Sequence, residues 1–209
     1  MAEIFEPHEI EKKSMETIVS ELNGRIWPEP TFSVVRRCIH TSADFDYADN
    51  LRFSEGAVEL GIKLLRSGAK IVTDTKMAYS GINKSRLETY RGSAYCFIND
   101  PDVVNIAKER GCTRATVSME KASELEGPVI FAIGNAPTAL IRICEMAKEG
   151  KIKPALVIGA PVGFVNVVES KEILMGADIP FIVPAGRKGG SNIAATICNA
   201  MLYYNGDVE

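Results

Sequence analysis

Short apolar runs rich in β-branched residues alternate along this chain with segments that carry apolar residues at helical spacing. The runs are clearest in the second half, at Val129–Gly134, Ala155–Gly159 and Pro180–Gly186. Helices are predicted around them, at residues 113–125, 137–150, 166–175 and 191–204. Parallel strands joined by helices and buried on both faces give this pattern. We therefore expect one α/β domain over residues 1–209, with a mostly parallel, doubly wound sheet and helices on both faces.

The first half of the chain carries the same two patterns with more interruptions. Apolar residues recur at i, i+3, i+4 and i+7 from Met15 to Leu22 and predict an amphipathic helix over residues 9–22. A loop is expected around Gly81. The other predicted elements are a strand at 33–40, a helix at 51–66, strands at 70–75 and 94–98, and a helix from Pro101 to Gly111.

Composition argues against several classes of function. The net charge of -3 gives no electrostatic reason to expect a nucleic acid or an anionic membrane surface as partner. No apolar run approaches the roughly 20 residues of a membrane span, and the acidic N-terminal segment lacks the apolar core of a signal peptide. The five cysteines are scattered without CxxC spacing, so we expect reduced, mostly buried thiols and no metal site. The sequence therefore predicts a cytoplasmic protein.

Ligands bind an open parallel sheet outside the carboxyl ends of its strands. The segments that follow the predicted strands are rich in Gly, Pro, Asn and Ser, which let the backbone approach a ligand and offer N–H donors. They are His40–Asp44, Asp74–Ile82, Gly134–Thr138, Gly159–Asn166 and Gly186–Ser191. A planar ligand with many carboxylates or amides suits such a surface. The candidate contacts in and beside these segments are Thr41, Met77, Gly81, Asn83, Asn135, Gly163, Asn166, Arg187, Lys188 and Ser191.

His40 is one of two histidines, and the predicted strand puts it at a carboxyl end beside Thr41 and Ser42. A histidine side chain ordinarily changes charge between pH 5 and 8, which suits proton exchange with a ligand. The alternative is that His40 satisfies a buried backbone group at the end of a strand. His8 falls in the polar first turn of the opening helix, and we expect it at the surface.

Two cations and three glycines precede the last predicted helix. Arg187 and Lys188 either form an anion clamp with the backbone N–H groups that follow, or lie in a solvated loop. The spacing is not that of a Walker A motif, and GAPVGF is not G-x-G-x-x-G, so the support for a nucleotide site is weak. Arg114 opens a predicted helix and either pairs locally or reaches a ligand carboxylate. Lys84 and Arg86 either contact the ligand or are solvated.

Taken together, these segments resemble one family. RRCI with HTSAD, then DTKMAYSGI, TRATVSMEKA, GNAPTAL, GAPVGFVNVVESKEIL and GRKGGSNIAA occur in the order found in precorrin-8/cobalt-precorrin-8 methylmutases. IEKKSMETI also resembles the first helix of that family. The similarity extends from about Ile10 to Ala200. The last two long motifs are the most specific, because each is long, ungapped and chemically unusual.

The resemblance implies an isomerase of cobalamin biosynthesis that moves a methyl group from C11 to C12 of (cobalt-)precorrin-8, giving hydrogenobyrinate or cobyrinate. It implies that His40 handles a ring proton and that Ser14 and Arg114 contact the corrinoid substrate. It also implies that no organic cofactor is needed, that any cobalt belongs to the substrate, and that the protein is a homodimer with active sites near the subunit interface. An intramolecular shift requires a rigid pocket and one protonation, and no strong nucleophile.

Two other functions stay open at this point. A nucleotide-dependent α/β transferase would use the segment Gly186–Ser191 for phosphate. A non-catalytic carrier would bind the corrinoid between pathway steps and leave it unchanged.

Overall fold

The computed structural model describes residues 6–208, apart from the side chains of Pro7 and His8. The expectation that His8 lies at the surface therefore falls outside the described residues. So does part of the expectation for the acidic N-terminal segment, which includes residues 1–5.

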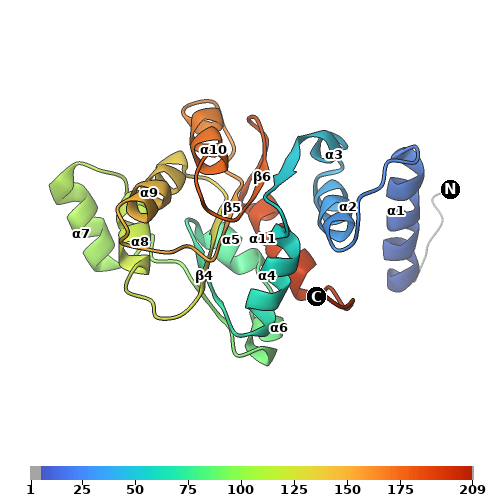
Figure 1. Ribbon diagram of the computed structural model, residues 1–209, viewed down its shortest axis with the longest axis horizontal. Coiled ribbons are helices and arrows are strands. Elements are labelled where there is room, and N and C mark those ends of the chain that lie inside the picture. The colour runs from blue at the N-terminus through green and yellow to red at the C-terminus, as the bar shows by residue number, and fades with distance from the viewer. Residues whose placement is uncertain (1–5, 209) are drawn as a thin grey trace.

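A six-stranded sheet runs through the middle of the molecule (Figure 1). Its strands lie in the order β1-β6-β5-β4-β2-β3, and neighbours pair in parallel except for β1, which pairs antiparallel with β6. This confirms the α/β class and the mostly parallel sheet. The bounds are β1 Leu51–Phe53, β2 Lys70–Thr73, β3 Ser93–Tyr95, β4 Val129–Ile133, β5 Leu156–Gly159 and β6 Phe181–Pro184.

Helices cover both faces of the sheet. α2, α4 and α11 pack on one face, and α8, α9 and α10 on the other. α1 stands at one end of the molecule beside α2, and α7 stands at the opposite end (Figure 1). The bounds are α1 Pro7–Glu21, α2 Thr31–Ser42, α3 Asp46–Asn50, α4 Ala57–Arg66, α5 Lys76–Gly81, α6 Lys84–Thr89, α7 Pro101–Arg110, α8 Arg114–Ala122, α9 Pro137–Lys148, α10 Val167–Met175 and α11 Ser191–Leu202.

Successive residues of the central strands point into two separate cores. Ile130 and Ile158 belong to the core under α2, α4 and α11, whereas their neighbours Phe131 and Val157 belong to the core under α8, α9 and α10. All four side chains are almost fully buried. Because side chains alternate across a strand, burial on both faces requires a continuous apolar run, which is the pattern that predicted these strands.

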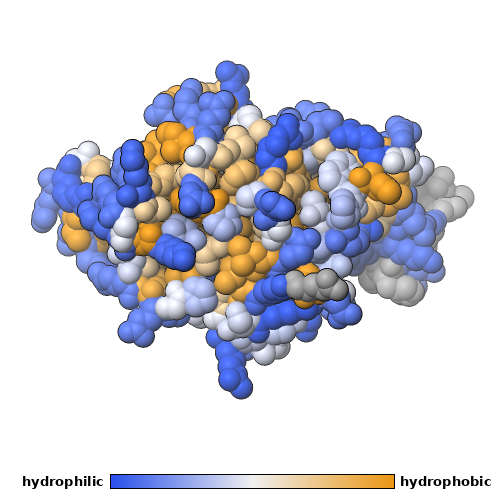
Figure 2. Space-filling model, in the orientation of Figure 1, coloured by the Kyte–Doolittle hydropathy of each residue, from blue (hydrophilic) through white to orange (hydrophobic). Residues whose placement is uncertain are grey.

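On the face shown in Figure 2, hydrophilic side chains cover the two ends and hydrophobic patches lie toward the centre. Among the helices of residues 6–208, none has the length and apolar character that crossing a bilayer requires. The five cysteines are free thiols; four are buried, and Cys112 is half-buried. Burial raises the pKa of Cys38 and that of Cys198 to about 12, so both thiols stay protonated at neutral pH.

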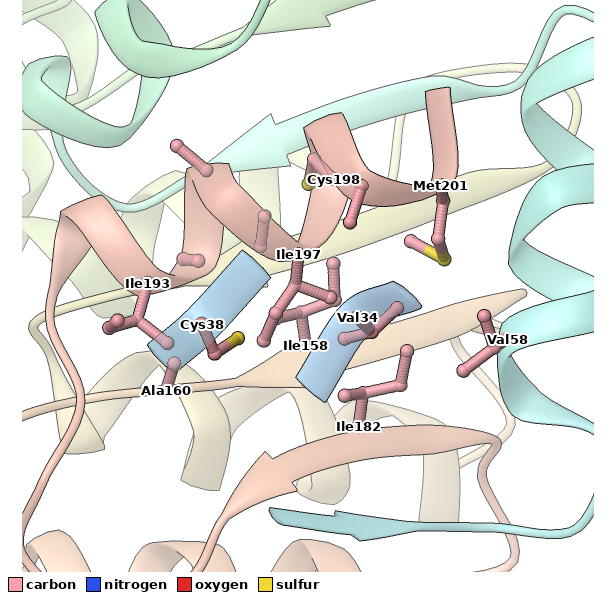
Figure 3. Packing of buried hydrophobic residues seen from close by; sticks show 14 of the residues in the cluster. Val34, Cys38, Val58, Ile158, Ala160, Ile182, Ile193, Ile197, Cys198 and Met201 are labelled. Atoms are coloured by element: carbon pink, nitrogen blue, oxygen red, sulfur yellow. The ribbon is translucent and has the colours of Figure 1, made fainter. Parts of the chain in front are cut away.

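The strand predicted at residues 33–40 is wrong, because this segment lies in helix α2. Figure 3 shows Val34 and Cys38 among Ile158 of β5, Ile182 of β6 and Ile197 of α11. The apolar residues of α2 share one helical face, which is buried against the sheet and α11, and two adjacent valines made the short run look like a strand. Its buried residues are Val34, Val35, Cys38 and Ile39.

Two smaller predictions are also wrong. Residues 51–53, expected to begin a helix, form the antiparallel edge strand β1, and the helix begins only after Gly56, whose φ is +64°. The loop expected around Gly81 contains the short helices α5 and α6. Their starts are capped by Thr75, whose hydroxyl accepts the Ala78 N–H, and by Asn83.

Gly134 at the end of β4 lies against the first turn of α11. A Cβ there would be 2.5 Å from the Cα of Ser191 and 2.8 Å from its nitrogen. We predict that Gly134→Ala lowers the free energy of unfolding by about 1–3 kcal/mol, because backbone on both sides must shift. Gly176→Ala is the control, since its nearest new contact would be 3.4 Å. Urea denaturation measures both, and equal stabilities for the two variants would contradict the prediction.

Candidate active site

The sheet reverses its winding between β2 and β4, and this point is where an open α/β sheet offers a crevice. From β2 the chain moves outward to β3 and then returns to pair β4 on the other side of β2. The helices that follow, α5 and α9, contact opposite cores of the molecule. The segments after β2 and β4 therefore border the expected crevice.

A buried carboxylate joins these two segments. Asp74 is 1% exposed, and its side chain accepts the backbone N–H groups of Gly134, Asn135 and Ala136 at 2.8, 2.9 and 2.6 Å. Burial raises the pKa of Asp74, and the three hydrogen bonds offset part of that rise. Both oxygens act as acceptors, which is the pattern of an ionised carboxylate. Asp74 thereby fixes the loop that begins α9.

The segments after β5 and β6 pack just as closely. The N–H of Gly190 donates to the carbonyl of Ala160 at 2.8 Å, and a Cβ on Gly189 would be 2.3 Å from the same oxygen. The hydroxyls of Thr75 and Ser191 are hydrogen-bonded at 2.7 Å. The carboxyl ends of β2, β4, β5 and β6 therefore form one connected edge, on which α11 begins.

His40 lies in the last turn of α2, and its side chain is exposed. Within the described part of the chain the imidazole has no hydrogen-bond partner. This observation removes the alternative that His40 satisfies a buried backbone group. The hydroxyl of Thr41, the next residue, is 3.0 Å from that of Thr196 on α11, so α11 connects the surroundings of His40 with the sheet edge.

Two clefts meet at His40. One, of about 520 Å³, lies between α2 and α11 and is lined by Arg37, His40, Thr41, Thr196, Asn199 and Tyr203, among others. The second, of about 470 Å³, lies between α1 and α2, and His40 and Ser14 both line it. Volumes of this size are those of ligand pockets. The structure thus brings Ser14, His40 and Thr41, all predicted site residues, to the same pair of clefts.

Gly81 and Asn83 reach the first cleft indirectly. The carbonyl of Gly81 accepts a hydrogen bond from Asn199, and the backbone N–H of Asn83 donates to the Asn199 side chain at 2.9 Å. The Asn83 amide also donates to the Tyr203 hydroxyl. Gly81 and Asn83 therefore hold two residues that line the cleft. Lys84 and Arg86 each donate to backbone carbonyls, which gives both a structural role.

The two cations after β6 differ in their surroundings. Lys188 contacts the carboxylates of Asp44 and Asp46 at 2.5 and 2.6 Å, so much of its charge is neutralised. Hydrogen bonding to Lys188 lowers the pKa of Asp44. Lys188 thus connects the turn after His40 to the sheet edge. Arg187 is exposed, and its guanidinium lies 5.4 Å from the centre of the Phe164 ring.

The other predicted contacts lie at the sheet edge. Met77 is 70% exposed, Asn135 follows β4, and Gly163 and Asn166 lie in the loop between β5 and α10 with positive φ. Ser191 begins α11, and its hydroxyl is hydrogen-bonded to that of Thr75. Arg114 begins α8, and its side chain donates to that of Asn99 at 3.1 Å. Among the described residues, Arg114 makes no contact with His40.

Sequence reasoning missed three kinds of residue here. Asp74 was inside a proposed loop, and its place directly after a buried strand was the available clue. Thr196 and Asn199 lie on the polar side of the last helix, one turn apart, and only the packing of α2 on α11 gives them a role. Lys171 is fully buried in α10, and nothing in its local sequence separates it from a surface lysine.

The comparisons with known proteins agree over nearly the whole chain. The precorrin-8X methylmutase family model matches residues 9–204. A cobalt-precorrin-8 methylmutase of Priestia megaterium is 45% identical, covering 94% of this chain and 87% of the relative. A precorrin-8X methylmutase of Pseudomonas aeruginosa is 42% identical, covering 92% and 93%. The crystal structure of precorrin-8X methylmutase from Thermus thermophilus superimposes with a TM-score of 0.85 at 40% identity, covering 93% and 94%.

The chain belongs to the precorrin-8X methylmutase family. It is therefore an isomerase of the methylmutase type, in cobalamin biosynthesis. This membership favours the isomerase over the nucleotide-dependent transferase and the carrier.

Asp74 offers a direct test of how this site is held. We predict that Asp74→Asn lowers the free energy of unfolding by about 1–3 kcal/mol, because one amide N–H₂ then faces a backbone N–H donor. Amide hydrogen exchange of residues 134–136 should accelerate more than exchange in β5. The exposed Asp178→Asn variant is the control. Unchanged exchange at 134–136 would show that the carboxylate does not fix this loop.

Proposed function

We propose that this chain moves the methyl group of (cobalt-)precorrin-8 from C11 to C12 with the help of a proton handled by His40. The bond from the methyl carbon to C11 breaks as its bond to C12 forms, so no methyl donor, oxidant or organic cofactor is consumed. Any cobalt enters as part of the substrate. The observation that carries the proposal is the position of His40, which is exposed where two clefts meet and has no hydrogen-bond partner among the described residues.

His40 acts in this proposal on the protonation of the ring. An imidazole with both ring nitrogens open to a ligand can give or take a proton, and proton transfer by a positioned side chain is worth about 10²–10⁴ in rate. Thr41 and Ser14, on either side, are suited to hydrogen bonds with the macrocycle. The clefts are open, which a large planar ligand requires.

The sheet edge supplies contacts for the periphery of the substrate. A corrinoid precursor carries carboxylates, and two exposed cations are available to them, Arg187 in the segment after β6 and Arg114 at the start of α8. Met77, Asn135, Gly163, Asn166 and Ser191 line the same edge and offer apolar surface, amides and backbone. Lys188 is bound to Asp44 and Asp46, so we assign it mainly to holding the turn after His40.

We predict that His40→Ala slows isomerisation by about 10²–10⁴-fold while the corrinoid still binds, because a proton-transfer group is lost and the clefts remain. The change of the visible spectrum on incubation with metal-free and cobalt-bearing precorrin-8 measures the rate, since migration alters the conjugation. His8→Ala, which removes the other histidine, is the control. Undiminished turnover by His40→Ala would remove the proton-transfer role.

The same samples distinguish the alternatives. If the wild type and His40→Ala both bind corrinoid and neither converts it, the carrier is the better description. Calorimetric titration with ATP and NAD tests the transferase, which requires clear nucleotide binding and no corrinoid binding.

We also propose that the chain works in the cytoplasm as a homodimer whose interface adjoins the sheet edge. Free, mostly buried thiols suit a reducing compartment. Phe164 is 84% exposed and Val165 76%, beside Val162 at 46%, all in the loop between β5 and α10. A cluster of exposed apolar side chains marks a binding surface. A second copy of this chain is the occupant that we propose.

Phe164→Asp should shift a dimer toward monomer, because it places a charge in the proposed interface. Light scattering after size-exclusion chromatography at several concentrations measures the mass. Ile26→Asp, at an equally exposed isoleucine that is 75% accessible, is the control. A monomeric wild type, or a dimer that Phe164→Asp leaves intact, would contradict the proposed interface.

A further inference from the structure

Lys171 of α10 is a buried charge that the mechanism leaves unused. Its side chain is 0% exposed, whereas lysines are almost never fully buried unless they are paired. Its ammonium donates to two neutral backbone carbonyls, those of Gly186 at 2.8 Å and Lys188 at 2.7 Å. No carboxylate of the described residues forms an ion pair with it.

The carbonyl between these two also has a donor. The N–H of Gly163 donates to the carbonyl of Arg187 at 3.2 Å. Three successive carbonyls of the segment 186–188 therefore have donors from the loop before α10 or from α10 itself. Gly186, with a φ of +77°, provides the backbone turn that this arrangement needs.

These hydrogen bonds to the carbonyls of residues 186–188 determine the position of Arg187. Its backbone is held on both sides by Lys171, and its side chain is exposed, with the guanidinium 5.4 Å from the Phe164 ring centre. Phe164 lies next to Gly163 in the same loop. The segment 186–188, which contains Arg187, is thus fixed to α10 through Lys171 and to the loop before α10 through Gly163.

A buried ammonium of this kind costs stability. Burial lowers the pKa of Lys171 to about 8, because desolvation disfavours the charged form. An apolar side chain of similar length would fill the same space without that cost. Buried groups that are costly to the fold are concentrated at functional sites.

We infer that Lys171 is a positioning residue, which holds the loop 186–188 so that Arg187 meets a carboxylate at the edge of the substrate. The inference rests on the proposed contact between Arg187 and the substrate. Lys171 itself touches no substrate. Its loss is therefore expected to weaken binding and to leave the methyl shift itself nearly unchanged.

Trypsin reports on the loop without any substrate, since it cleaves after Arg187 and Lys188. In Lys171→Met, native-state cleavage at these two bonds should accelerate by about tenfold, because local opening becomes easier. Cleavage after Lys151, between α9 and β5, should stay at the wild-type rate. Lys63→Met, at an exposed lysine of α4, is the matched control. Unchanged cleavage after Arg187 and Lys188 would overturn the inference.

A double-mutant cycle then tests the route through Arg187. Lys171→Met should raise KM for precorrin-8 by about tenfold with kcat within about twofold, and should add less than about twofold in an Arg187→Gln background, since residues that act as a unit are not additive. Full additivity, or a loss confined to kcat, would overturn the inference. If Arg187→Gln alone leaves KM unchanged, the proposed substrate contact fails, while the trypsin result still decides the role of Lys171 in the loop.

Lys171→Gln serves if the methionine variant does not fold. Its amide keeps two N–H donors on a shorter chain and removes the charge. Cleavage after Arg187 and Lys188 should then rise above the wild-type rate by less than about tenfold, and wild-type cleavage in Lys171→Gln would overturn the inference that the Lys171 ammonium holds this loop.

Discussion

The hydrogen bonds from the loop after β4 to the carboxylate of Asp74 are the contacts on which the sheet edge of the site most depends. They cross the point where the winding of the sheet reverses, and at that point α5 and α9 lie on opposite sides. The backbone N–H groups of residues 134–136 lie between β4 and α9, and they need acceptors. One carboxylate satisfies all three of them. The loop is thereby rigid without a bulky side chain, and the edge stays open to a ligand.

Helix α11 connects this edge of the sheet to the surroundings of His40. Its first residue, Ser191, is hydrogen-bonded to Thr75, which follows β2, and Thr196 in its middle is hydrogen-bonded to Thr41. The apolar face of α2 is buried against α11 and the sheet, as Figure 3 shows. His40 therefore owes its position to helix packing. A pocket between helices on a fixed sheet edge suits a large rigid substrate, because positions relative to the ring are then preserved through the reaction.

The sequence predicted the sheet well where both faces of a strand are buried, as at β4 and β5. A short, continuous run of β-branched apolar residues there favours a buried strand over a helix. It failed at α2, where Val34 and Val35 favour a strand locally and the contact with α11, distant in sequence, decides for a helix. It missed β1 because three residues that pair with β6 carry almost no local pattern. The loop segments were found by their composition, but the partners of Lys188 and Lys171 depend on side-chain directions that only the folded chain defines.

Two buried charged side chains hold loops at this edge of the sheet. Asp74 accepts N–H groups of the loop before α9, and Lys171 donates to carbonyls of the loop before α11. Each accepts hydrogen bonds from neutral backbone or donates them to it, and neither forms an ion pair with a described residue. Hydrogen bonds to a charged group are about twice as strong as neutral ones, which suits loops that must stay in place when a ligand binds. Burying these two charges reduces the stability of the fold. In return, the backbone of this edge is fixed while its side chains stay exposed.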